Sequence, residues 1–73
     1  MSANGQQTFR IEIDREEAGR WIADIEALPG ALAYGQSREE AIAKVEALAL
    51  RVIADQIEEN GKPQDEVRFE PCA

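Results

Sequence analysis

Single polar residues separate the hydrophobic residues near the start of the chain. This two-residue period is typical of a strand with one buried face, and it predicts a strand over residues 8–14. The period returns over residues 20–26, after a turn that contains Gly19, so the two segments are expected to form an antiparallel hairpin. The positions that should face the core are Phe9, Ile11, Ile13, Trp21, Ala23 and Ile25. Residues 1–7 are mostly polar, and we expect a disordered tail there.

Chain-breaking residues delimit a short third strand. Pro29 cannot donate a backbone hydrogen bond to a central ladder, so the second strand should end before it. Gly35 then stops the hydrophobic run of residues 31–34. We therefore expect a strand of these residues between the two breakers.

A long amphipathic helix is expected next. Glu40 follows Ser37 by three residues, which is the pattern of a capping box, and the Glu40 carboxylate should accept a hydrogen bond from the Ser37 amide. The helix should run to about Asn60, because Gly61 suits a left-handed cap and Pro63 blocks continuation.

A last strand completes the predicted fold. Residues 66–70 alternate again between hydrophobic and polar positions. The predicted order is therefore β-β-β-α-β, in one α+β domain over residues 8–71. We expect a three- to four-stranded, mostly antiparallel sheet with one long helix packed on one face.

The predicted helix has two hydrophobic strips. The first should pack on the sheet and consists of Ala41, Ile42, Val45, Leu48, Ala49, Val52 and Ile53. The second lies beside the charged face and consists of Ala43, Ala47, Leu50, Ala54 and Ile57. Because a helix outside a small sheet does not need a second strip, we predict a self-association surface there. The alternative is that the alanines serve helix propensity alone.

The sheet face away from the helix is expected to be acidic. Its first two strands should present there Arg10, Glu12, Asp14, Ile22, Asp24 and Glu26. A surface of this kind can bind a basic partner, and the last five residues are the candidate contacts. The alternative is a plain solvated face, which antiparallel sheets often have.

Charge and composition narrow the class of partner. The 73 residues carry a net charge of −7, which opposes binding to nucleic-acid phosphates or an anionic membrane. The charge suits a basic protein, and it also serves solubility. The start of the chain has no hydrophobic segment typical of a secretory signal, no run approaches a membrane span, and the single cysteine, Cys72, cannot form an internal disulfide. We expect a cytoplasmic protein.

No residue pattern indicates catalysis. Histidine, the commonest general base and metal ligand, is absent, and so is any glycine-rich phosphate motif. Asp14, Asp24 and Glu26 are the candidate Mg²⁺ ligands on neighbouring strands, but a solvated strand face explains them better in so acidic a chain. We expect no enzyme activity, no cofactor and no bound metal.

One combination of motifs resembles a known family. The residues that carry it are Trp21, Ala23, Leu28, Pro29, Gly30, Gly35, Ser37, Glu39, Glu40, Ala41, Gly61 and Pro63. They give an aromatic strand, Leu-Pro-Gly, a short strand, a glycine, a capped helix and Gly-x-Pro, in that order. Over roughly residues 9–70 the chain therefore looks like a HicB-type antitoxin.

The resemblance implies both a fold and a function. The fold would be a partial ribonuclease-H-like one without a catalytic carboxylate set. The function would be to neutralise a HicA-type toxin, a small basic mRNA-cleaving protein, and assembly into dimers or tetramers is expected. Since the residues present include no DNA-binding domain, we expect no direct binding to nucleic acid. The alternative is a standalone homo-oligomer with a regulatory or structural role and no toxin.

Overall fold

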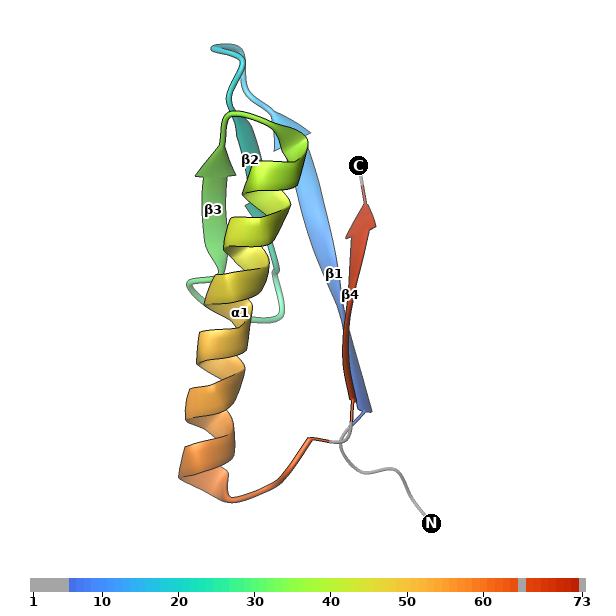
Figure 1. The fold of residues 1–73 in the computed structure, drawn as a ribbon, viewed down its shortest axis with the longest axis vertical. Helices are drawn as coiled ribbons and strands as arrows, with labels where there is room; N and C mark the ends of the chain where they lie inside the picture. Colours follow the sequence, from blue (N-terminus) through green and yellow to red (C-terminus); the bar gives the residue numbers. More distant parts are fainter. Residues whose placement is uncertain (1–5, 65, 73) are drawn as a thin grey trace.

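One long helix crosses one face of a four-stranded sheet (Figure 1). The coordinates are a computed structural model that describes residues 6–64 and 66–72. The elements in chain order are β1 (Gln6–Arg15), β2 (Trp21–Asp24), β3 (Leu32–Gly35), α1 (Arg38–Asn60) and β4 (Glu66–Cys72). The predicted α+β class and the β-β-β-α-β order are confirmed.

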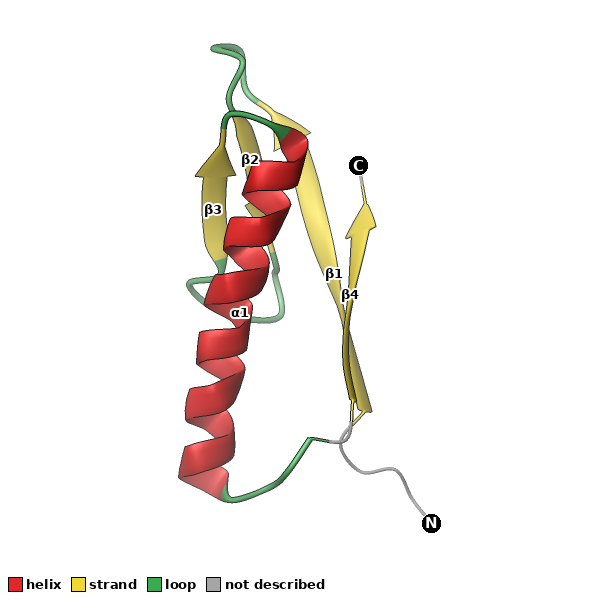
Figure 2. Cartoon of the chain, viewed as in Figure 1, coloured by secondary structure: helices red, strands yellow, loops and turns green. Residues whose placement is uncertain are grey.

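The sheet is mixed, with the strand order β3-β2-β1-β4. β1 pairs antiparallel with β2, β2 pairs antiparallel with β3, and β1 pairs parallel with β4. The parallel pair requires a crossover between its strands, and α1 lies on that crossover (Figure 2). β1 pairs with β4 over 6–12 and with β2 over 12–15, so each half of this long strand has its own neighbour.

Strand boundaries differ from the sequence prediction at several ends. Gln6 and Gln7, which were expected in the tail, belong to β1, and the rest of that tail lies outside the described residues. β2 stops at Asp24 because the chain then turns: the Ala31 N–H donates to the Leu28 carbonyl at 3.0 Å. The same turn includes Ala31, so β3 covers Leu32–Gly35 and not the predicted residues 31–34.

β4 is longer than predicted and runs through Pro71 to Cys72. An inner strand donates backbone N–H groups to the strands on both of its sides, and proline has no N–H to donate. Proline is tolerated in an edge strand, where its position can face solvent. β4 is such an edge strand.

The core lies between the sheet and α1. Five of the six strand positions predicted to face it are buried, and Trp21 is half-buried with the Arg15 guanidinium 5.7 Å from its ring centre. The buried residues of α1 form a row at four-residue spacing: Ala41, Val45, Ala49 and Ile53. The other predicted residues of that strip, Ile42, Leu48 and Val52, pack against this core and are partly buried.

Both ends of α1 are capped by local hydrogen bonds. The Ser37 hydroxyl accepts a hydrogen bond from the Glu40 N–H at 3.1 Å, as predicted. The Glu40 carboxylate, however, accepts from the Gln36 N–H at 2.6 Å, one residue before the amide that we expected. At the other end, Gly61 has φ 68° and its N–H donates to the Ile57 carbonyl at 2.8 Å, which confirms the predicted stop.

Gly35 explains the second chain breaker. A Cβ atom added there would lie 2.5 Å from the backbone nitrogen of Ala41. Real Cβ atoms do not approach a backbone this closely, so only glycine lets the first turn of α1 rest on β3. Gly30 is needed for a different reason. It follows Pro29 in a turn and has a φ of 86°, a backbone conformation that favours glycine.

Candidate functional site

The sheet face opposite α1 collects most of the predicted contact residues. Register pairs place Glu12 opposite Asp24 and Asp14 opposite Ile22 across β1 and β2. Directly opposite residues of antiparallel strands point to the same face, so these four side chains form one patch, which we call the acidic face. Both β1 carboxylates are exposed, and the two β2 residues are half-buried.

Glu26 does not belong to this patch. β2 ends two residues earlier, and Glu26 lies exposed in the turn that leads towards Pro29. Sequence alternation placed it on the strand because the turn residues Ile25 and Leu28 are themselves buried and continue the hydrophobic pattern.

The acidic face encloses a surface hollow of about 280 Å³. Its lining consists of Glu12, Ile13, Asp14, Ile22 and Asp24. Ile22 supplies a hydrophobic spot among the three carboxylates. The hollow therefore offers negative charge and a small apolar surface at the same place.

Like charges face each other in this patch. Glu12 lies directly opposite Asp24, an arrangement that destabilises an antiparallel pair. Within the described part of the chain, no lysine or arginine forms an ion pair with these two carboxylates or with Asp14. The Asp14 carboxylate accepts a hydrogen bond from the N–H of Arg15, at 2.9 Å. The negative charges of the acidic face are thus left for solvent or for a partner.

Arg10 is the cation of β1 that shares a sheet face with Glu12, and it also interacts with Cys72. The pKa of its guanidinium is raised first by a hydrogen bond with the Cys72 side chain and then by the charges of Glu12 and Glu70. Since Arg10 shares its strand with Glu12, it lies at the border of the acidic face.

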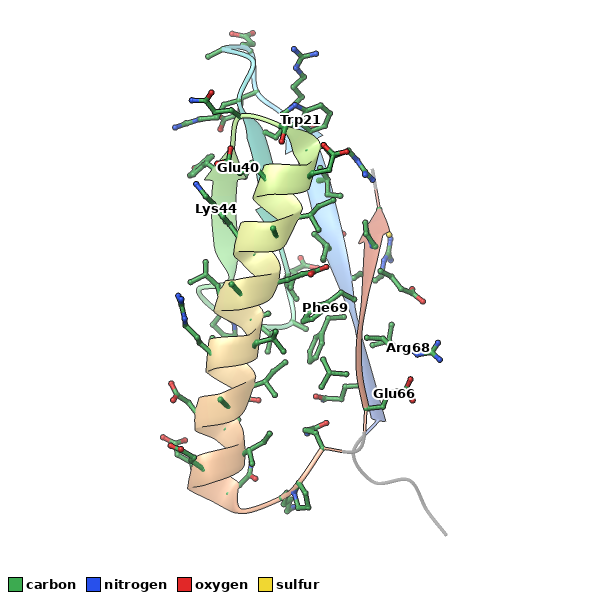
Figure 3. All side chains as sticks on the ribbon, in the orientation of Figure 1. Trp21, Glu40, Lys44, Glu66, Arg68 and Phe69 are labelled. Atoms are coloured by element: carbon green, nitrogen blue, oxygen red, sulfur yellow. The ribbon has the colours of Figure 1, made fainter. Side chains whose placement is uncertain are left out.

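The alternation of β4 is visible in the side-chain view. Phe69 points from β4 towards the helix side, whereas Arg68 points the other way (Figure 3). Phe69 packs against Phe9 with ring centres 6.0 Å apart. Arg68 pairs with Glu66 at 2.8 Å. Polar side chains of β4 thereby extend the solvated face of the sheet.

Two hydrophobic residues of the same sheet face were not predicted. Leu32 lies opposite Asp24 and Tyr34 lies opposite Ile22 in the β2–β3 register, and they are 43% and 39% exposed. The Arg20 guanidinium stacks over the Tyr34 ring at 4.1 Å. The alternation of large and small residues in this run indicates that Leu32 and Tyr34 share one face, but it does not say which face. The sequence predicts this run only as a short apolar strand.

The second helical strip is exposed in its upper part. Ala43, Ala47, Leu50 and Ala54 are all exposed, and the leucine reaches 50%. Ile57 is different, because it is half-buried and packs against the core. It follows Ile53 by four residues and so continues the buried row of α1.

The residues that carry the family resemblance act in the architecture of the fold. Leu28 is buried in the core, and Pro29 and Gly30 form the turn before β3. Gly35 and Ser37 position and cap α1. None of these residues lies in the acidic face.

The polar and charged side chains of the described residues lie at the protein surface. No charged or polar residue among them is buried, and no three of their histidine, cysteine, aspartate or glutamate side chains could hold a metal ion together. Asp14, Asp24 and Glu26 are accordingly not arranged as a metal site. The arrangement can bind a positively charged group.

Comparisons with known proteins found no match to this chain. No family model matches it, and neither a curated protein nor a solved structure does. Among the described residues, no helix is long and apolar enough to cross a membrane.

Proposed function

We propose that the acidic face binds a basic protein, and that the chain acts as a HicB-like antitoxin against a small basic HicA-type mRNA-cleaving toxin. The observation that carries the proposal is the unpaired like-charge pair of Glu12 and Asp24, with Asp14 beside it. A lysine or arginine of a partner would relieve this repulsion on binding. Arg10 attracts Glu12 along β1, but no described cation forms an ion pair with Glu12, Asp14 or Asp24.

Electrostatics would speed the encounter as well as define the contact. A net charge of −7 attracts a basic protein over a distance of about 10 Å at moderate salt. Ile22 then provides an apolar centre within a charged rim, which is the usual arrangement of a protein interface. The same charge repels RNA, so the chain would block the RNA-binding surface of a toxin by covering it. This mechanism places the chain in the cytoplasm, where mRNA is cleaved.

The identity of the partner rests on the resemblance over residues 9–70, and the surface rests on the structure. The two parts can be tested separately. The chain is mixed with a purified HicA-type toxin, and binding is measured by calorimetry and by inhibition of RNA cleavage. Absence of binding to such a toxin would contradict the antitoxin part.

Charge reversal tests the surface. Asp14→Lys with Asp24→Lys should weaken toxin binding at least tenfold, because it inverts the acidic face. Asp55→Lys with Glu58→Lys makes the same change in net charge on exposed positions of α1 and should weaken binding far less. Equal losses in the two double variants would show that net charge alone attracts the toxin, and the acidic face would then not be the site.

A standalone homo-oligomer is the second candidate function. The observation that favours it is Leu50, which is 50% exposed amid the small side chains of Ala43, Ala47 and Ala54. Leu50→Glu should dissociate an assembly that is built on this strip. Light scattering on the variant decides, since an unchanged mass would remove the strip as an interface.

A further inference from the structure

The two edges of the sheet are protected to different degrees. β4 forms one edge and carries Pro71 and three charged residues, features that discourage pairing with another strand. β3 forms the other edge, and its sequence Leu-Ala-Tyr-Gly has neither charge nor proline. An unprotected edge strand is a template for a further strand. β3 is therefore the edge at which this sheet can grow.

The backbone of β3 has groups available on its outer side. The Ile25 N–H donates to the Ala31 carbonyl at 3.0 Å, which fixes the phase of the β2–β3 ladder. Because antiparallel ladders alternate, Ala33 turns its backbone groups to β2, and Leu32 and Tyr34 turn theirs outwards. The Leu32 N–H is engaged with the Gly30 carbonyl at 3.0 Å. The Leu32 carbonyl and both Tyr34 groups face the free edge.

The side chains of β3 are complementary to those of a second, antiparallel copy of β3. Leu32 and Tyr34 are two of the three large hydrophobic residues that are exposed in the described part of the chain. If two copies of β3 pair antiparallel about Ala33, each leucine lies opposite the tyrosine of the second copy. Both pairs then fall on the sheet face away from α1. The two small Ala33 side chains meet on the helix side, where little space is available.

Charge favours pairing about Ala33 over pairing centred on Tyr34. The Leu32 end of β3 lies beside Asp24, and Glu26 follows in the turn. The Tyr34 end carries the cations Arg20 and Lys44, which line one hollow there and are each paired with a glutamate. Antiparallel pairing about Ala33 keeps the two acidic ends apart and places each near the cations of the other copy. Pairing centred on Tyr34 would instead bring the two Arg20 side chains together.

We propose that β3 is a self-association edge, through which two copies of this chain form a two-fold dimer with one continuous eight-stranded sheet. The contact repeats itself about the axis, as in other two-fold interfaces. The inference is independent of the proposed toxin binding, because it concerns the chain alone. It leaves Glu12 and Asp14 of both copies uncovered, and the dimer would present two acidic faces.

The first test measures mass in solution. Light scattering after size exclusion, at chain concentrations up to about 1 mM, should give twice the 8.1 kDa of the chain. Leu32→Lys should raise the dimer dissociation constant at least tenfold, because lysine on an edge strand opposes pairing. Leu50→Lys is the matched control, since this leucine is similarly exposed but lies on α1, and the dimer should persist.

Each other outcome of that test counts against the proposal. A wild-type chain that stays monomeric over the whole range overturns it. So does a Leu32→Lys variant that dimerises like the wild type. If only Leu50→Lys dissociates the assembly, the interface is the helical strip. Circular dichroism and thermal unfolding should show both variants folded, because both positions are exposed.

A second test addresses the register. In the proposed pair, the two Ala33 Cα atoms lie about 4.5 Å apart, within reach of a disulfide. In a Cys72→Ser background, Ala33→Cys should form a covalent dimer on mild oxidation. Ala43→Cys, an exposed alanine of α1, should not. A dimeric chain that fails to cross-link through position 33 would overturn the register.

Discussion

Gly35 lies against Ala41 so closely that β3 and the first turn of α1 touch through their backbones. A Cβ atom at Gly35 would be 2.5 Å from the Ala41 nitrogen and 2.9 Å from the Glu40 carbonyl carbon. The helix is therefore fixed to the edge strand without side chains between them. This contact also keeps the capped end of α1 over β3.

Gly35→Ala should consequently destabilise the fold by about 1–3 kcal/mol, the usual range for forcing a methyl group into a packed site. Urea unfolding measures the change. Gly61→Ala is the control, because nothing lies within 4 Å of its added Cβ and only its left-handed φ opposes alanine. A Gly35→Ala variant as stable as the wild type would mean that the helix can move away from β3 at little cost.

Ile11 should be among the most sensitive positions of the core. Its side chain is completely buried in β1, and Ile11→Ala is expected to cost about 2–5 kcal/mol. Leu50→Ala, at a half-exposed position, should stay within about 0.5 kcal/mol of the wild type. Thermal and urea unfolding of the two variants give the comparison, and similar losses would contradict the described core.

The Glu40 carboxylate should make stability depend on pH. Its pKa is lowered from 4.5, first by the hydrogen bond from the Gln36 N–H and then by the charge of Lys44. A lowered pKa in the folded state means that the stabilisation is present above 4.5. It is lost as the pH falls below 4.5 and through the lower folded value.

Glu40→Gln should therefore differ most from the wild type near neutral pH, and the difference should shrink as the pH falls through that window. Thermal unfolding at a series of pH values measures it. Glu39→Gln removes the same charge from the same helical turn without that hydrogen bond, so it should show a smaller change. A wild-type minus Glu40→Gln difference that stays constant from neutral pH to below 4.5 would be inconsistent with this assignment.

Neutralising the acidic face should stabilise the chain on its own. Asp24→Asn removes the like-charge repulsion with Glu12 and should raise the free energy of unfolding by a few tenths of a kcal/mol. The gain should fall with added salt, because screening weakens the repulsion in the wild type. Asp55→Asn on exposed α1 is the control. A destabilised Asp24→Asn variant at low salt would show that this carboxylate has a favourable partner.

The helix was predictable because its ends depend on local residues. Ser37 and Gly61 cap it through bonds within a few residues, and such bonds are readable from sequence. The sequence places Ile57 in the second strip because the buried row of α1 does not stay at one angle around the helix axis. Residues four apart differ by about 40° around that axis, so the buried row gradually turns towards the second strip. The buried row of α1 advances by four residues each time, and after several turns it reaches Ile57.

The direction of β3 was not predictable from its own residues. Hydrophobic pattern suggests that larger side chains face the core, yet Leu32 and Tyr34 face outwards. The reason is the closeness of α1, beneath which only Ala33 and Gly35 fit. That closeness is a property of the packed structure, as is the turn that removes Glu26 from the acidic face.

The division of β1 between two neighbours has a consequence for the order of folding. β2, β3 and α1 reach their places through contacts between nearby segments, whereas β4 pairs Glu66 with Gln6 across nearly the whole chain. Closing so long a loop costs the most chain entropy, so β4 should be the last strand to join and the first to leave. In a hydrogen-exchange experiment, the backbone amides of β4 should therefore exchange through partial opening of the structure. The amides of the β1–β2 pair should exchange more slowly, because they become exposed only on global unfolding.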